Sequence, residues 1–281
     1  MASLRRLRRT AANLAFTGFC YIGTIIAIAV LSAILWTLVV KGAGGVKLDV
    51  FTKSTPAAGS PGGLLNAIVG SLIMCAMGMV FAVSVGVLAG TWLAEYGRSS
   101  WYAQLVRFMN DILLSAPSVL VGLFVYAVLV QPFGGFSALA GGVALALIAV
   151  PIITRTTEDV LKLQPTALRE SSVALGTPLW TTIRKVLWKS AGSGILTGAL
   201  LAFARISGET APLLFTALNN QFFSWNLNKP MASLPIVIFQ FALSPYDDWI
   251  ALAWAGALIV AVAVLATNIA ARIITRERHP S

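Results

Sequence analysis

The chain has 281 residues, of which 58% are hydrophobic and only 11% are charged. A soluble domain carries about 25% charged residues, so this composition excludes an ordinary soluble protein and is typical of a polytopic membrane protein. The formal net charge is +10, but in a membrane protein lysines and arginines mark cytoplasmic loops rather than a nucleic-acid surface. We therefore expect an all-α, single-domain membrane protein that lies in a lipid bilayer and has no nucleic-acid partner.

The first apolar run, Phe16–Val40, is too long for the core of a signal peptide and long enough to cross a bilayer. We expect it to be the first of six spans, with the N-terminus in the cytoplasm because four arginines precede it. A loop rich in Gly, Pro and Ser follows at 41–63. The second span, 64–93, carries Gly86 and Gly90, a spacing that lets another helix approach closely.

Four more apolar segments are expected to span the membrane: 108–130, 137–153, 191–218 and 249–271. Basic residues mark the long segment 154–190 and the chain end as cytoplasmic, so both termini lie inside and segment 219–246 lies outside. Pro117 and Pro212 predict kinks at which a pathway could be gated, because proline lacks an amide and clashes with the preceding turn. The chain thus divides into a basic tail, one transmembrane domain with a long inner loop, and a second basic tail: 1–15, 16–272 (inner loop 154–190) and 273–281.

The fifth predicted span contains two charged residues, Arg205 and Glu209, one helical turn apart. A charge at the bilayer centre costs about 2.5–3.5 kcal/mol even on the lenient insertion scale, so the two side chains must face protein, water or each other. On a continuous helix they share a stripe with small residues and a proline: Gly194, Gly198, Ala202, Gly208 and Pro212. We interpret this stripe as lining the path of an anion; a structural ion pair that joins helices is the alternative.

The sequence lacks the motifs of an enzyme. It has no Gly-x-x-x-x-Gly-Lys-Ser/Thr phosphate loop, no Gly-x-Ser-x-Gly nucleophile elbow and no zinc-ligand spacing. The one histidine, His279, lies near the chain end, and Cys20 and Cys75 are expected to be small buried hydrophobes rather than a disulfide or metal pair. We expect no catalytic residue, no metal and no bound cofactor, so energy for pumping would come from another subunit.

The long inner loop reads Glu170-Ser-Ser-Val-Ala-Leu-Gly176, with the aliphatic Val186 ten residues later. This resembles the EAA loop of ABC importer permeases, in which Glu-Ala-Ala-x-x-x-Gly is followed by an aliphatic residue and then Leu-Pro. Ser171 and Ser172 stand at the alanine positions, and Lys189 replaces the usual proline. The resemblance implies a MetI-like permease core and a short helix that docks on an ATP-binding subunit. The residues it assigns to this ATPase coupling are Arg169, Glu170, Ser171, Ser172 and Gly176.

The stretch Arg205-Ile-Ser-Gly-Glu-Thr-Ala-Pro212 is similar to a signature of the permeases of phosphate-specific ABC importers. Other stretches resemble the same branch: Phe51-Thr52 with Pro56, Gly59, Gly62 and Gly63; Asn66-Ala-Ile-Val-Gly-Ser71; Leu93-Ala-Glu-Tyr96; Pro117-Ser118 with Gly122-Leu-Phe124; Arg155-Thr-Thr-Glu158; and Ser233-Leu-Pro235. The resemblance covers nearly the whole chain from about Phe16 onward. It assigns Arg205 and Glu209 to transport, and we place Ser207 and Thr210 of the same motif in the substrate pathway.

The resemblance implies a complex in the bacterial plasma membrane. It would contain a homologous PstC-type permease subunit, two PstB-type ATP-binding subunits that carry ATP and Mg²⁺, and an extracytoplasmic PstS-type phosphate-binding protein. Arg205 would offer a forked, charge-assisted contact to the anion. Two roles are open for Glu209: it holds Arg205 between passages, or it accepts a hydrogen bond from protonated phosphate.

Three other functions are weighed against phosphate import. The first is a permease for another oxyanion, such as sulfate or molybdate. The others are a passive anion channel and a membrane scaffold, against which the loop from Glu170 to Gly176 argues because neither needs a docking helix for an ATPase.

Overall fold

The computed structural model describes residues 2–57, 60–97 and 100–276. Within these ranges every regular element is helical. Five helices are long and apolar enough to cross a membrane, and a sixth span is present if one sharply bent helix pair is counted as one. The predicted all-α, polytopic organisation is therefore confirmed. Residues 277–281 of the predicted C-terminal tail lie outside the described part of the chain.

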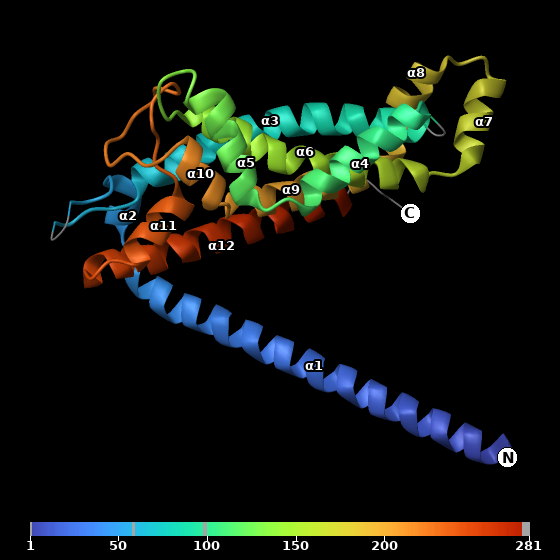
Figure 1. Cartoon of the computed structure of the whole chain (residues 1–281), viewed down its shortest axis with the longest axis horizontal. Helices are drawn as coiled ribbons and strands as arrows, with labels where there is room; N and C mark the ends of the chain where they lie inside the picture. Colours follow the sequence, from blue (N-terminus) through green and yellow to red (C-terminus); the bar gives the residue numbers. More distant parts are fainter. Residues whose placement is uncertain (1, 58–59, 98–99, 277–281) are drawn as a thin grey trace.

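Four long helices run along the main axis of the bundle in Figure 1: α3 (Leu65–Glu95), α6 (Ala138–Lys162), α9 (Trp188–Ser207) and α12 (Asp247–Arg276). Helix α6 lies at the centre and contacts both α3 and α9. It begins at a good N-cap, because the Ser137 hydroxyl accepts a hydrogen bond from the Ala140 amide at 3.1 Å. The main hydrophobic core forms where α3, α6 and α9 meet, around Met74, Leu145, Ile153 and Ile206.

Glycines bring α3 and α6 into backbone contact. A Cβ atom on Gly90 would lie 2.5 Å from the Thr154 carbonyl oxygen, and one on Gly86 would lie 2.8 Å from Cβ of Ile153. The predicted close approach of another helix at these two glycines is thus confirmed. Small residues at this spacing are the usual basis of tight helix packing in membranes, where apolar burial gives no net drive between helices.

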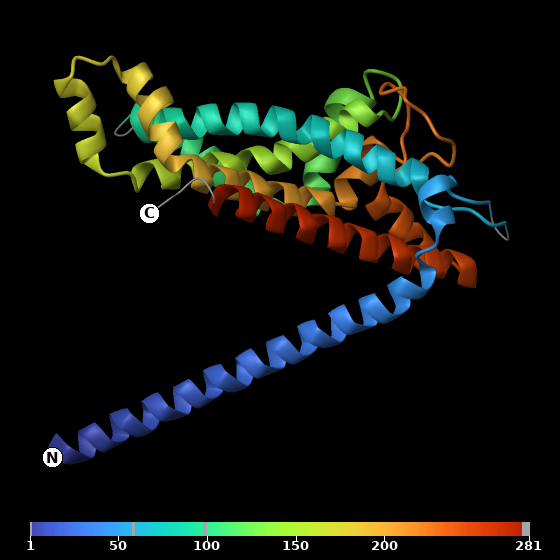
Figure 2. The same ribbon diagram turned by 180° about the vertical axis from the view of Figure 1, so that it is seen from behind.

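Helix α1 (Ala2–Gly45) diverges from the bundle, as Figures 1 and 2 both show. The predicted tail and first span form one continuous helix whose apolar surface is exposed along its length. It packs against the start of α12, where a Cβ atom on Gly45 would lie 2.6 Å from the Ala251 carbonyl oxygen. The N-terminal end of α1 and the C-terminal end of α12 point toward the same end of the bundle.

The third span is broken rather than merely kinked. Helix α4 (Trp101–Ser115) ends before Pro117, and α5 (Ser118–Val125) with its π-helical continuation η1 (Tyr126–Val130) leaves at 106° to it. Proline at this position cannot continue the hydrogen-bond ladder of α4, which explains the position of the break. The sequence predicted the site of the bend but not its size.

The fifth span is also broken, so the prediction of one continuous helix with a single stripe is wrong. Helix α9 ends at Ser207, Gly208 follows as its C-cap, and α10 (Ala211–Thr216) starts anew with Pro212 in its first turn. Glycine is common at the C-terminal end of a helix and proline in the first turn, which explains the break between Gly208 and Pro212. The short helices α5 and α10 then pack together so closely that a Cβ atom on Gly122 would lie 2.7 Å from Cα of Pro212.

Shorter helices close the two ends of the bundle. One end carries α7 (Thr166–Ala174), α8 (Leu179–Thr182) and the π-helix η2 (Ile183–Leu187); the other carries α2 (Leu48–Thr52) and α11 (Leu234–Ala242) (Figure 1). Helix α11 lies within the segment expected to be an outer connection, yet it is buried against α12. Helix α4 likewise begins before the predicted start of the third span at residue 108, and α6 extends beyond the predicted end of its span.

Substitution of a packed glycine tests the contact between α3 and α6. Gly90→Ala should destabilise the protein by about 1–3 kcal/mol, because the added methyl group overlaps backbone atoms that cannot move aside. The matched control is Gly192→Ala in α9, where an added Cβ meets nothing within 4 Å and alanine favours the helix. Melting temperatures of the purified variants in detergent give the comparison, and equal values would contradict the packing described here.

Candidate functional site

Arg205 lies in the last turn of α9, beside the break in the fifth span. Its side chain is 54% exposed, whereas that of Glu209 is 13% exposed, and Nη2 of the arginine lies 3.4 Å from Oε1 of the glutamate. Within the described residues, no hydrogen bond from the Arg205 side chain is found beyond this ion pair. The predicted pair is thus present, but the guanidinium keeps most of its donors free.

Arg205 lines a small cavity of about 90 Å³ at the break between α4 and α5. Apart from Arg205 and Ser118, the residues that line the cavity are apolar: Leu113, Leu114, Ala116, Val121, Ile148 and Ile152. A free cation in such surroundings attracts an anion more strongly than it would in water, because the local dielectric constant is lower. The two broken spans therefore meet at one cavity that holds a positive charge.

The other predicted pathway residues, Ser207 and Thr210, are not among the residues that line this cavity, and they differ in their availability. The Ser207 hydroxyl donates to the Phe203 carbonyl oxygen of its own helix at 2.7 Å, so its hydrogen is already used. Thr210 occupies the N-cap position of α10 but makes no capping hydrogen bond through its side chain. Pro117 and Pro212, the predicted kink residues, stand at the two breaks themselves.

The predicted coupling residues lie at the end of the bundle, on and after α7. Glu170 and Ser171 are exposed. Ser172 is buried, and its Oγ atom lies 2.7 Å from Oγ1 of Thr182 in α8. Gly176 has φ +69°, a left-handed conformation that strains other residues, and this sharp turn sends the chain from α7 into α8.

Arg169 attaches α7 to the bundle. Its Nη2 and Nε atoms donate to the two carboxylate oxygens of Glu95 at 2.6 and 3.0 Å, and further donors reach the carbonyl oxygens of Gln164 and Leu161 at 2.9 and 2.8 Å. The hydrogen bonds with Glu95 raise the pKa of Arg169 above its already high usual value. Sequence reasoning placed Arg169 in the coupling region but did not find its partner, Glu95, 74 residues earlier.

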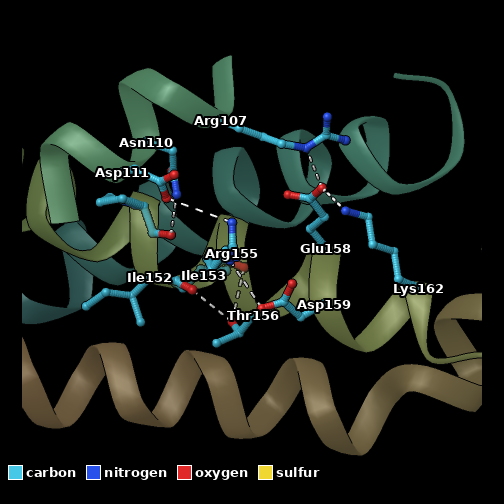
Figure 3. Close-up of polar contacts among 11 residues, drawn as sticks. Arg107, Asn110, Asp111, Ile152, Ile153, Arg155, Thr156, Glu158, Asp159 and Lys162 are labelled. Atoms are coloured by element: carbon cyan, nitrogen blue, oxygen red, sulfur yellow. Dashed lines mark hydrogen bonds and ion pairs between the residues drawn. The ribbon is translucent and has the colours of Figure 1, made fainter. Parts of the chain in front are cut away.

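A second buried charge cluster was missed altogether (Figure 3). Glu158 of α6 has a side chain only 1% exposed; it accepts a hydrogen bond from Nε of Arg107 at 2.7 Å and another from Nζ of Lys162. Arg107 also donates to the Leu93 carbonyl oxygen at 3.0 Å, so that it links α4, α6 and α3. The spacing of Glu158 and Lys162 was a usable signal for an ion pair, but nothing local pointed to Arg107.

No group of three or more His, Cys, Asp or Glu side chains that could hold a metal ion occurs in the part of the chain that the structure describes.

Comparisons with known proteins agree with this arrangement. The family described as binding-protein-dependent transport system inner membrane component matches residues 86–279, more than half of the chain. Phosphate transport system permease protein PstA of Haemophilus influenzae is 52% identical over 276 residues, covering 98% of each chain. PstA of Yersinia pestis is 53% identical over 248 residues, covering 88% of this chain and 84% of its own. PstA 1 of Mycobacterium tuberculosis strain H37Rv is 32% identical over 287 residues, covering 97% and 92%.

Among solved structures, the fold resembles a chain of the MetNI methionine ABC transporter in an inward-facing conformation. The TM-score is 0.67 at 20% identity, and the match covers 77% of this chain and 96% of that one. The predicted MetI-like core is thus confirmed at the level of the fold, and the family places the chain in the bacterial inner membrane. This chain belongs to the family of binding-protein-dependent transport system inner membrane components and, within it, to the PstA permeases.

Proposed function

We propose that this chain is the transmembrane permease subunit of an ATP-driven importer of inorganic phosphate, in which it forms half of the translocation pathway. Relatives at 52–53% identity carry the name of phosphate transport permease, which supports the substrate. The structural observation that carries the proposal is the half-exposed Arg205 side chain, loosely paired with Glu209, which lines a small cavity at the break between α4 and α5.

Arg205 would bind phosphate as it passes. A guanidinium presents two parallel donors to an oxyanion, and a hydrogen bond between charged partners is about twice as strong as a neutral one. The contact with Glu209 is long, at 3.4 Å, so phosphate can replace the carboxylate without breaking a short hydrogen bond. Return of Glu209 to the guanidinium after passage would favour release. The Glu209 side chain is less exposed than that of Arg205, and this suits a partner of the guanidinium better than an acceptor for protonated phosphate.

The energy would come from ATP-binding subunits that dock on α7 and α8, so this chain itself binds no ATP or Mg²⁺. The docking surface is apolar and exposed: Leu163, Val173, Leu175, Leu179 and Trp180. Exposed apolar side chains rimmed by charge at the end of a bundle are typical of a protein interface. A homologous PstC-type permease would supply the other half of the pathway, and a PstS-type binding protein would deliver phosphate at the opposite end.

Other oxyanions fit the same chemistry, because one guanidinium in a small cavity does not by itself distinguish phosphate from sulfate. Phosphate is preferred on the identity of the relatives. A passive channel is disfavoured because it needs no docking surface for an ATPase.

Charge removal at Arg205 tests the substrate contact. In cells that depend on this transporter, Arg205→Gln should lower phosphate uptake by about tenfold or more, which corresponds to the loss of one charge-assisted hydrogen bond of roughly 1.5–3 kcal/mol. Arg205→Lys should retain part of the uptake. Arg8→Gln, at an exposed arginine far from the cavity, serves as the control. Full uptake by an assembled Arg205→Gln transporter would remove this residue from the pathway.

The attachment of α7 is tested at Glu95. Glu95→Gln leaves Arg169 buried without its anion and should destabilise α7 by about 3–5 kcal/mol, because breaking one half of a buried pair costs far more than the pair contributes. Asp49→Asn, which removes the exposed partner of Lys53, should cost no more than about 1 kcal/mol. Hydrogen exchange of the α7 amides measures the effect, and unchanged protection in Glu95→Gln would show that the pair does not hold α7.

The docking surface is tested by charge insertion. Leu175→Asp should abolish co-purification of the ATP-binding subunit, because Leu175 is 84% exposed at the end of the bundle and a buried carboxylate at an interface is costly. Leu48→Asp is the matched control, since Leu48 is 79% exposed on α2 at the opposite end. Loss of the ATPase in both variants, or in neither, would contradict docking at α7 and α8.

A further inference from the structure

The arginines of α4, α6, α7 and α9 fall into two kinds. Arg107 and Arg169 are largely buried and make short hydrogen bonds to a carboxylate and to backbone carbonyl oxygens, two from Arg107 and four from Arg169. Arg155 and Arg205 are about half exposed, at 47% and 54%, and within the described residues neither side chain makes a hydrogen bond that meets ordinary geometry. The first kind holds helices together; the second keeps its donors free.

Arg155 is built like Arg205 in a further respect. Each is loosely paired with a carboxylate four residues later in the sequence. Nε of Arg155 lies 3.3 Å from Oδ2 of Asp159, and Nη2 of Arg205 lies 3.4 Å from Oε1 of Glu209. A second carboxylate, Asp111 of α4, lies 3.8 Å from Nη1 of Arg155 (Figure 3). Both aspartates are more than half exposed, so water or an anion can reach the guanidinium between them.

The position of Arg155 follows from the cavity that holds Arg205. Ile148 and Ile152 of α6 line that cavity, and Arg155 comes next on the same helical face, about 4.5 Å further along the axis at 1.5 Å per residue. On α4, Leu114 lines the cavity and Asp111 lies one turn before it. The group formed by Arg155, Asp111 and Asp159, labelled in Figure 3, therefore lies further along α6 than the Arg205 cavity. Helix α6 leads in this direction to the end that carries α7 and α8 in Figure 1.

We propose that Arg155 is a second anion-binding residue of the pathway, which receives the oxyanion from Arg205 on its way to the α7 end. This inference rests on the proposed function and adds to it a second station for the same inorganic oxyanion. Transport across several weak sites permits both entry and release, because no single site holds the ion tightly. Asp159 acts at Arg155 as Glu209 acts at Arg205: it occupies the guanidinium when the anion has left.

A purely structural role for Arg155 would be to join α4 to α6. Those helices are already joined by Arg107 with Glu158 at 2.7 Å, and by the Asn110 amide, which donates to the Pro151 carbonyl oxygen at 3.2 Å. The contact between Arg155 and Asp111, at 3.8 Å with both side chains about half exposed, adds little to these, because exposed ion pairs contribute about 0–1 kcal/mol.

The test uses the complete transporter reconstituted in vesicles, with phosphate uptake and ATP hydrolysis measured together. Arg155→Gln should lower uptake by about tenfold while ATP hydrolysis stays within about twofold, since the ion pairs of Arg155 are with Asp111 of α4 and Asp159 of α6. Arg155→Lys should recover part of the uptake. Asp111→Asn breaks the contact between α4 and α6 but keeps the guanidinium, and should retain more than half of the uptake. Equal losses in Arg155→Gln and Asp111→Asn, without recovery by Arg155→Lys, would show a structural role and overturn the proposal.

A second measurement does not require the loss of Arg155. In a chain with Cys20→Ala and Cys75→Ala, inorganic phosphate should slow the reaction of Asp159→Cys with an anionic thiol reagent by about threefold or more, and should not protect Leu163→Cys, one turn further on. Absence of protection at Asp159→Cys would overturn the second station. Normal uptake in Arg155→Gln with loss in Arg205→Gln would remove this inference alone, whereas an unmodified transporter that takes up no phosphate would refute the proposed function itself.

Discussion

The cost of placing a charge among apolar helices governs this structure. A charged side chain at membrane depth must find a counter-charge, hydrogen-bonding partners or water. Glu95 and Glu158 are buried against Arg169 and Arg107, which donate short hydrogen bonds to them and to backbone carbonyl oxygens. These clusters fix the ends of α3, α4, α6 and α7 relative to one another. Arg205 has only a loose partner, Glu209, and lines a cavity. It is therefore available to a ligand, unlike the arginines that hold helices together.

Breaks in two spans create the place where this free charge lies. Unpaired backbone groups are tolerated at membrane depth only where protein or a polar cavity surrounds them. The breaks at Pro117 and at Gly208 meet because α5 packs against α10 through Gly122 and Pro212, which leaves the C-terminal turn of α9 at the cavity wall. The close contact between α5 and α10 therefore determines where the Arg205 side chain lies.

The sequence predicted much of this because membrane helices follow simple rules. The lengths of the apolar segments located the spans, and the glycine spacing located the contact between α3 and α6. The pair Arg205–Glu209 was found because two charged residues lie within an otherwise apolar segment. Two features could not be predicted from the sequence. The buried α11 was taken for an outer segment because nine residues are too few to mark a span. The partners Glu95 and Arg107 were not found because a tertiary ion pair between distant residues leaves no local pattern.

The most direct measurement is a structure of the assembled transporter with a heavy oxyanion, such as tungstate, trapped during transport. The account predicts density for the anion within hydrogen-bond distance of the Arg205 guanidinium, in a cavity shared with the second permease subunit. A structure in which Arg205 is covered by lipid, or is saturated by side chains of the other permease with no solvated route beside it, would contradict the central claim.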